Sequence, residues 1–196
     1  AAVIAGSFAF LGRKNYFRRL WDISADSLSE YLVDINAGGR SAYATGAMAA
    51  FDEHPIFGVG LGASGFWIYN HLPDWTLTTV PEVAKQLNPE SKLYPNPKNL
   101  YVRLLAETGL VGFAFFFMFL LSSLADSLVL LPRGQFSRFL GIAGIFAWLA
   151  IALYNVTQDS LATPNIWIIP GIVAGISLSI SPLAPRFREG KSKETA

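Results

Sequence analysis

The chain has 196 residues, of which 52% are hydrophobic, 14% aromatic and only 15% charged, whereas soluble globular domains carry about 25% charged residues. This composition excludes a disordered chain and argues against an ordinary soluble domain. The net charge of +1 creates no field that would favour nucleic acid as a partner, and the absence of cysteine excludes disulfides, thiol nucleophiles and cysteine-ligated zinc or iron–sulfur sites.

The chain opens on an uncharged stretch, residues 1–12, which a basic cluster at 13–19 follows. The uncharged stretch is too short to cross a hydrocarbon core, which requires about 20 residues. We therefore expect 1–12 to be the end of a truncated membrane helix and 13–108 to form a long extracytoplasmic (periplasmic) loop region. The basic cluster is typical of a helix end at the lipid headgroups, and anchoring of a phosphate-bearing lipid is the alternative.

An alanine-rich stretch, 40–51, has apolar and aromatic residues at helical spacing. It predicts a short helix that ends near His54, because the residue before a proline is driven out of the α region. A glycine-rich turn comes next and includes Gly58, Gly60 and Gly62. Glycines there allow the backbone to approach another segment closely.

The segment 73–97 contains prolines and asparagines without a periodic apolar run, and it predicts an ordered loop. Asn99 is the expected N-cap of the helix that follows. Asn99, Arg103 and Glu107 share one face of this helix at spacing i, i+4 and i+8, so Arg103 and Glu107 can form an ion pair. The pair is interpreted equally well as a structural salt bridge and as part of a binding site.

Three apolar runs in the second half of the chain have about the length that a membrane helix needs. They occupy 109–131, 139–156 and 166–183. The loop 132–138 and the tail 184–196 carry several basic residues, which predicts a cytoplasmic position for both. The loop 157–165 and the region 13–108 then face outward. The predicted fold class is all-α: a polytopic α-helical membrane protein with a long outward-facing loop that contains short helices.

Few side chains in the sequence are candidates for catalysis or ligand binding. His54 and His71 are isolated from acidic residues in any recognisable metal spacing, so no metal site is predicted. No Ser-His-Asp arrangement and no phosphate-binding Gly-Lys-Ser/Thr loop occurs either. The cationic side chains Arg40, Lys98 and Arg103 remain, and the guanidinium group in particular suits a phosphate or a diphosphate.

Three sequence blocks occur in a fixed order before the apolar runs. They are RSAY from residue 40, FDEHPIFGVGLG over 51–62 and NLYVRLLAETGLVG over 99–112. Together they resemble the C-terminal signature of the O-antigen ligase and O-antigen polymerase superfamily. The resemblance implies a multi-pass protein of the bacterial plasma (inner) membrane, related in fold to the GT-C glycosyltransferases. Such proteins move a glycan from an undecaprenyl diphosphate carrier to an acceptor hydroxyl with no metal and no cofactor.

The resemblance also implies roles for individual residues. Arg40 matches the arginine that holds the diphosphate, whose charge grows as the glycan leaves. Ligases of this family usually have a histidine base where this chain has Lys98, and a lysine is a good phosphate ligand but a poor general base. This departure favours a polymerase over a ligase. It leaves Glu53, His54 and His71 as alternatives for the base.

We therefore predict a metal-independent enzyme of surface polysaccharide synthesis, an O-antigen or exopolysaccharide polymerase. The alternatives are a ligase that transfers the glycan to lipid A-core and a non-catalytic membrane transporter or accessory protein. The expected partners are an undecaprenyl diphosphate-linked glycan, the lipid bilayer and a glycan or lipid A-core acceptor, with no nucleic acid. The predicted catalytic residues are Arg40, Lys98, Glu53 and His54, and the predicted binding residues are Arg40, Arg103, Asn99, Glu107, Gly60 and Gly62. The 196-residue segment alone is expected to be inactive.

Overall fold

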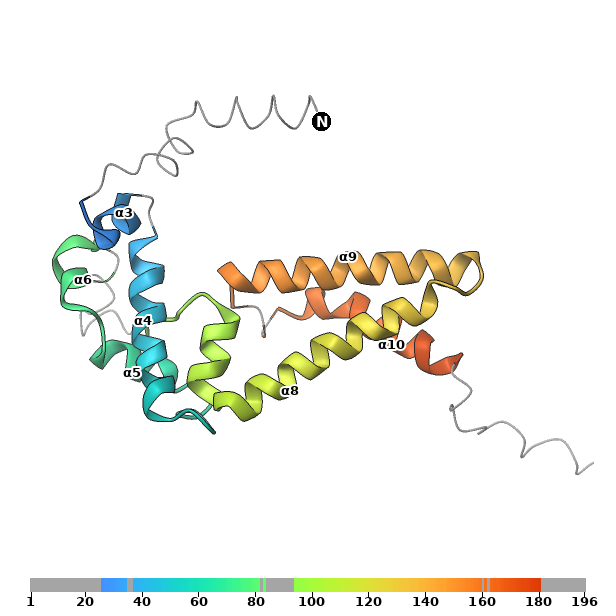
Figure 1. The fold of residues 1–196 in the computed structure, drawn as a ribbon, viewed down its shortest axis with the longest axis horizontal. Helices are drawn as coiled ribbons and strands as arrows, with labels where there is room; N and C mark the ends of the chain where they lie inside the picture. Colours follow the sequence, from blue (N-terminus) through green and yellow to red (C-terminus); the bar gives the residue numbers. More distant parts are fainter. Residues whose placement is uncertain are drawn as a thin grey trace, which may run out of the picture. The chain divides into compact units, whose positions relative to one another are not determined.

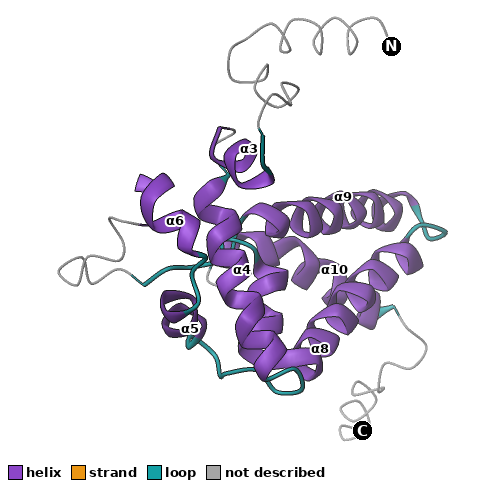
Figure 2. Ribbon diagram, turned by 60° about the vertical axis from the view of Figure 1, so that its left-hand side comes forward, coloured by secondary structure: helices purple, strands orange, loops and turns teal. Residues whose placement is uncertain are grey.

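All regular elements that the computed structural model describes are helices, which confirms the all-α class (Figure 1, Figure 2). The structure describes residues 26–34, 37–81, 83, 94–159, 161 and 163–180. The predictions for 1–12, for the basic cluster at 13–19 and for the tail 184–196 lie outside these residues. The chain divides into two compact units, 1–113 and 114–196, and each is described by itself.

The first unit is built around one central helix. Its elements are α3 (Leu28–Asp34), α4 (Gly38–Glu53), α5 (Ser64–Asn70), α6 (Asp74–Thr79) and the first part of α8 (Leu100–Leu130). Helices α3, α5 and α6 each pack against α4. The sequence predicted a helix over 40–51, and α4 extends this range at both ends.

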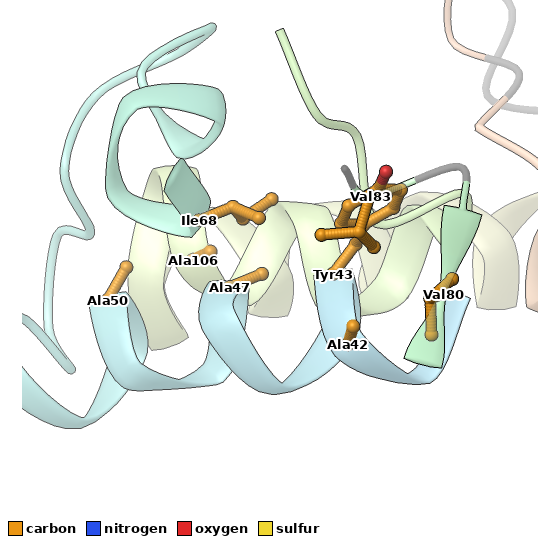
Figure 3. Packing of buried hydrophobic residues seen from close by; sticks show 8 residues of the cluster. All are labelled: Ala42, Tyr43, Ala47, Ala50, Ile68, Val80, Val83 and Ala106. Carbon is orange, nitrogen blue, oxygen red and sulfur yellow. The ribbon is translucent and has the colours of Figure 1, made fainter. Parts of the chain in front are cut away.

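Small residues on one face of α4 allow this close packing. Figure 3 shows Ala47 of α4 on the side that faces Ile68 of α5 and Ala106 of α8, and all three side chains are fully buried. A Cβ atom placed on Gly46 would lie only 3.0 Å from the Ile68 Cα. Because the contact is nearly backbone to backbone, larger residues on this face of α4 would push α5 away.

Helix α8 contains a break in the first unit. Gly109 has φ 63° and ψ −163°, which is not a helical conformation. In an unbroken α-helix, the amides of Leu110 and Val111 would donate to the carbonyls of Ala106 and Glu107. The break leaves these four backbone groups in need of other partners.

The loop after α4 supplies all four partners. The amides of Val59 and Gly60 donate to the carbonyls of Ala106 (3.0 Å) and Glu107 (2.9 Å), and the carbonyls of Pro55 and Ile56 accept from the amides of Leu110 (2.8 Å) and Val111 (3.2 Å). We call this pairing of 55–60 with 106–111 the kink contact. It joins two of the sequence blocks through their backbones.

Two glycines make the kink contact possible. Gly58 has φ 66°, and a Cβ atom on it would overlap the backbone of Glu107. A Cβ atom on Gly109 would overlap the backbone of Ile56. The expectation that the glycine turn lets two segments approach closely is therefore confirmed at Gly58. At Gly60 and Gly62 a Cβ atom would meet nothing within 4 Å.

The second unit contains the rest of α8, α9 (Gln135–Thr157), the short 3-10 helix η2 (Pro164–Trp167) and α10 (Ile168–Ser179). By length and composition, α8 and α9 are able to cross a membrane, and α10 is a shorter apolar helix. Within the unit, the Trp148 indole of α9 donates to the Leu120 carbonyl of α8 at 2.8 Å. Many large apolar side chains of these helices point outward, as lipid-facing residues do.

Candidate functional site

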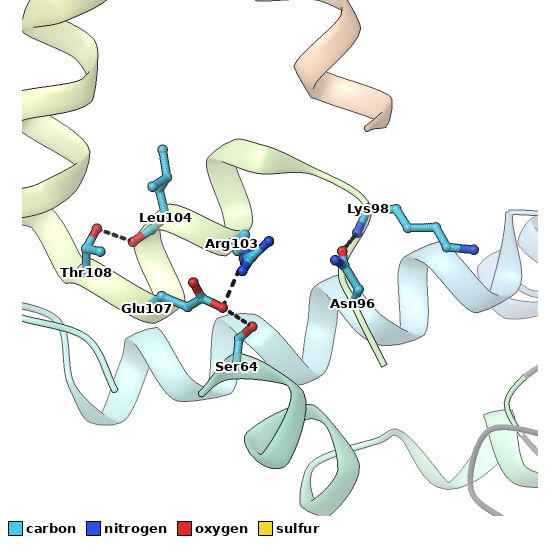
Figure 4. Close-up of polar contacts among 7 residues, drawn as sticks. All are labelled: Ser64, Asn96, Lys98, Arg103, Leu104, Glu107 and Thr108. Carbon is cyan, nitrogen blue, oxygen red and sulfur yellow. Dashed lines mark hydrogen bonds and ion pairs between the residues drawn. The ribbon is translucent and has the colours of Figure 1, made fainter. Parts of the chain in front are cut away.

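A buried carboxylate on α8 is the centre of the polar contacts in the first unit (Figure 4). The Glu107 side chain is only 1% exposed. Its Oε1 atom accepts a 3.0 Å bond from the Arg103 Nε and a 2.6 Å bond from the Ser64 hydroxyl of α5. The ion pair predicted from the i, i+4 spacing is confirmed, and Ser64 is a partner that the sequence analysis missed.

Glu107 is held through its main chain as well as through its side chain. The Glu107 carbonyl takes part in the kink contact through the amide of Gly60. The other carboxylate oxygen, Oε2, is buried and has no hydrogen-bond partner among the residues that the structure describes. Taking an ionised carboxylate out of water is costly unless a cation compensates it. Arg103, whose side chain is 27% exposed, provides that compensation and also reaches the surface.

We expect Arg103→Ala to destabilise the protein by about 2 kcal/mol, because it leaves the Glu107 charge buried and unpaired. Fully buried pairs cost about 3–5 kcal/mol when one partner is removed, and Arg103 is partly exposed. The double variant Arg103→Met with Glu107→Leu should recover most of this loss, because it leaves no buried charge without a partner. Thermal melting of both variants checks this. A double variant no more stable than Arg103→Ala would contradict it.

Two asparagines shape the chain just before α8. The Asn99 Oδ1 accepts a 3.1 Å bond from the Val102 amide, which confirms Asn99 as the N-cap. The Asn96 Oδ1 accepts a 2.7 Å bond from the Lys98 amide. Lys98 itself has φ 48°, a left-handed conformation that is uncommon for residues other than glycine. In Figure 4 the Lys98 side chain extends away from Arg103 and Glu107.

The backbone of Lys98 leads to a prediction about stability. Lys98→Gly should stabilise the protein by about 1 kcal/mol relative to Lys98→Ala, because both variants remove the ammonium group and only alanine keeps the left-handed strain. Thermal melting of the two variants measures the difference. A Lys98→Ala variant as stable as Lys98→Gly would show that this conformation carries no strain.

The structure separates some of the residues that the sequence analysis grouped as catalytic. Arg40 is exposed in the first turn of α4, whereas Glu53 is its last residue and His54 is its C-cap. Thirteen residues of helix correspond to about 20 Å along the axis. Arg40 therefore lies at the opposite end of α4 from Glu53 and His54.

A second cluster of side chains lies at the C-terminal end of α4. The His71 Nε2 is 3.4 Å from the Glu53 carboxylate, and its Nδ1 is 2.9 Å from the Trp67 carbonyl. The His71 ring stacks on the Trp67 ring, with centroids 5.2 Å apart and planes at 14°. The His54 ring meets the Trp67 ring edge-on, with centroids 5.2 Å apart and planes at 83°. Of the three residues proposed from the sequence as alternative bases, His54 and His71 thus both contact Trp67, and Glu53 contacts His71.

Metal ligands do not gather in the part of the chain that the structure describes. No group of three or more histidine, aspartate or glutamate side chains is close enough there to hold an ion. The described side chains offer cations for an anionic ligand, and carboxylate and imidazole groups for hydroxyls.

Comparison with known proteins places this site in a family. The family model described as O-Antigen ligase matches residues 1–117, which include both clusters and the kink contact. The comparisons with curated proteins and with solved structures give no match. The family consists of glycan-transferring membrane enzymes, and two helices long and apolar enough to cross a membrane agree with this. Since the match covers more than half of the chain, the protein belongs to the O-antigen ligase family.

Proposed function

We propose that the protein is a membrane glycosyltransferase that moves a glycan from an undecaprenyl diphosphate carrier to an acceptor hydroxyl. The observation that carries the proposal is the ion pair of Arg103 with the buried Glu107, which lies inside the region matched by the family model. A guanidinium held by a buried carboxylate is oriented before any ligand arrives. Such preorganised charge is well suited to phosphate oxygens.

The reaction breaks one bond and forms another at the anomeric carbon of the donor glycan. The acceptor oxygen bonds to this carbon while the bond to the diphosphate oxygen breaks, and the hydroxyl proton leaves to a base. The diphosphate departs with increased negative charge. Arg40, Lys98 and Arg103 would stabilise that charge, so we propose that the reaction needs no metal ion. Glu53 and His54 remain hypotheses for the base if the acceptor approaches from the C-terminal end of α4.

We also propose where the site lies relative to the membrane. The region 13–108 would face outward from the inner membrane, since the loop 132–138 contains Arg133 and Arg138 without an acidic residue. In this arrangement the site meets lipid-linked glycans on the outer side of the bilayer. Asn99 and Gly60 would contribute by holding Lys98 and Glu107 in place, because Asn99 caps α8 and Gly60 bonds to the Glu107 carbonyl.

The size of the products distinguishes a polymerase from a ligase. We favour a polymerase, because Lys98 stands where ligases of this family usually have a histidine. The test incubates the full product of the gene in liposomes with undecaprenyl diphosphate-linked oligosaccharide and resolves the glycans by length. A ladder of repeat lengths supports a polymerase. A single transfer that occurs only when lipid A-core is added would instead identify a ligase.

A further inference from the structure

A shallow pocket of about 130 Å³ opens on the surface of the first unit, beside α5. Its lining residues are Phe66, Trp67, Asn70 and His71. Phe66 is 56% exposed, and its ring lies 4.7 Å from the ring of Tyr94, which is 65% exposed. Two exposed aromatic rings in contact at the edge of a pocket are costly to leave in water, so this surface is expected to be covered by a ligand.

The polar groups at the pocket indicate what kind of ligand it takes. His71 is held from three directions, by the Trp67 carbonyl, by the Trp67 ring and by the Glu53 carboxylate. Asn70 is exposed, so its side-chain amide is accessible to a ligand. An oriented imidazole and an available amide, beside aromatic carbon, can bind hydroxyl groups with both donors and acceptors.

This combination excludes two other classes of ligand on chemical grounds. A purely apolar ligand would cover Asn70 and His71 without satisfying their hydrogen-bonding groups, which is unfavourable. A phosphate group would lie near the Glu53 carboxylate and be repelled by it. A sugar ring has an apolar C–H face for the aromatic rings and hydroxyls for the amide, imidazole and carboxylate.

We propose that Phe66, Trp67, Asn70 and His71 form a saccharide subsite that holds one neutral sugar ring of the glycan being transferred. The inference rests on the proposed function and names the part of the substrate that this surface binds. Its position agrees with that role. The pocket residues follow Ser64, the partner of Glu107, by two to seven residues, which is about 3 to 10 Å of helix. A glycan could therefore extend from the Arg103–Glu107 pair along α5.

Saccharide binding can be measured without glycan transfer. The probe is the oligosaccharide that mild acid releases from the host's own lipid-linked glycan, and the full product of the gene is held in nanodiscs. Saturation-transfer NMR should show binding to the wild type, and Phe66→Ala and Asn70→Ala should each weaken it about tenfold. The matched control is Tyr69→Ala, which removes a 45% exposed aromatic ring of the same helix that does not line the pocket. This variant should bind as the wild type does.

Two outcomes would overturn the subsite. The first is equal affinity of Phe66→Ala, Asn70→Ala and Tyr69→Ala for the oligosaccharide, or a wild type that does not bind it. The second is a loss of affinity for lipid vesicles in Phe66→Ala with saccharide binding intact, which would make this surface a membrane contact.

Binding of undecaprenyl diphosphate without glycan separates this proposal from the proposed function. Phe66→Ala should bind that carrier as tightly as the wild type does, which supports a subsite for sugar alone. If the wild type binds the oligosaccharide in this pocket but neither binds the carrier nor transfers glycan, the subsite is supported and the proposed function fails. If the wild type transfers glycan and Phe66→Ala keeps full affinity for the oligosaccharide, only the subsite fails.

Discussion

Gly109→Ala is expected to destabilise the protein by about 4 kcal/mol or more and to abolish glycan transfer. The conformation of Gly109, φ 63° and ψ −163°, is almost closed to residues with a Cβ atom. The added methyl group would also overlap the Ile56 backbone, which the hydrogen bond to the Val111 amide fixes in place. Relieving the overlap requires the kink contact to open, and each of its four hydrogen bonds contributes about 1 kcal/mol.

Two other glycine variants separate the cost of the backbone conformation from the cost of the steric overlap. Gly62 has a positive φ of 81°, but a Cβ atom on it would meet no atom within 4 Å. Gly62→Ala should therefore lower the free energy of unfolding by about 1 kcal/mol. Gly134 has φ −56°, and a Cβ atom on it would also meet no atom within 4 Å. Gly134→Ala should therefore change the free energy of unfolding by no more than about 0.5 kcal/mol. Thermal melting of the full product in detergent measures all three. A Gly109→Ala variant that melts like Gly134→Ala would show that the kink contact does not hold the two segments together.

Arg40→Ala is expected to lower glycan transfer by about 100-fold or more while folding and membrane insertion are unchanged. Arg40 is exposed on α4, so its removal opens no cavity. Removing one preorganised group that stabilises transition-state charge costs about 10²–10³ in rate. The loss should appear in the turnover number more than in the apparent affinity for the carrier, because the diphosphate charge grows as the glycan leaves.

The control for Arg40→Ala is Arg133→Ala, which removes an exposed arginine of the second unit, outside the region matched by the family model. It should transfer glycan at the wild-type rate. Transfer is measured in proteoliposomes with equal amounts of inserted protein. Equal losses in the two variants would point to a general effect of charge, and an unchanged rate in Arg40→Ala would contradict its assignment to the diphosphate.

Helix capping and residue spacing within one helix were sufficient to predict the start of α8. The Asn99 cap and the Arg103–Glu107 pair follow from spacings of three and four residues, and both are present. These contacts depend only on helix geometry, which the sequence pattern determines directly. The all-helical class was predictable for a related reason, since long apolar runs favour helices.

The contacts that complete the site are not local, and the sequence does not reveal them. Ser64 bonds to Glu107 across 43 positions of sequence. The kink contact pairs backbone groups, which carry no side-chain signature, and Gly58 and Gly109 were its visible signals. The separation of Arg40 from Glu53 could have been predicted from the helix rise alone, because the sequence already indicated one helix between them.

The cluster of Glu53, His54, Trp67 and His71 also depends on packing. Each of the three was considered for the same role because of its chemistry, with no information on how they meet. The structure brings them together because α5 crosses the end of α4, through Ile68 and the small residues of α4. Tertiary packing of this kind follows from which faces of two helices are small enough to approach, which spacing within one helix does not determine.

In the proposed function, the protein cleaves the bond between a glycan and a diphosphate carrier and passes the glycan to a hydroxyl. The most direct test is to measure free undecaprenyl diphosphate by mass spectrometry in liposomes that contain the full product, the lipid-linked glycan and an excess of metal chelator. We expect one free carrier for each glycosidic bond formed, and a rate that the chelator does not change. A carrier that stays fully glycosylated in the presence of folded, inserted protein and acceptor would contradict the claim and favour a transport or accessory role.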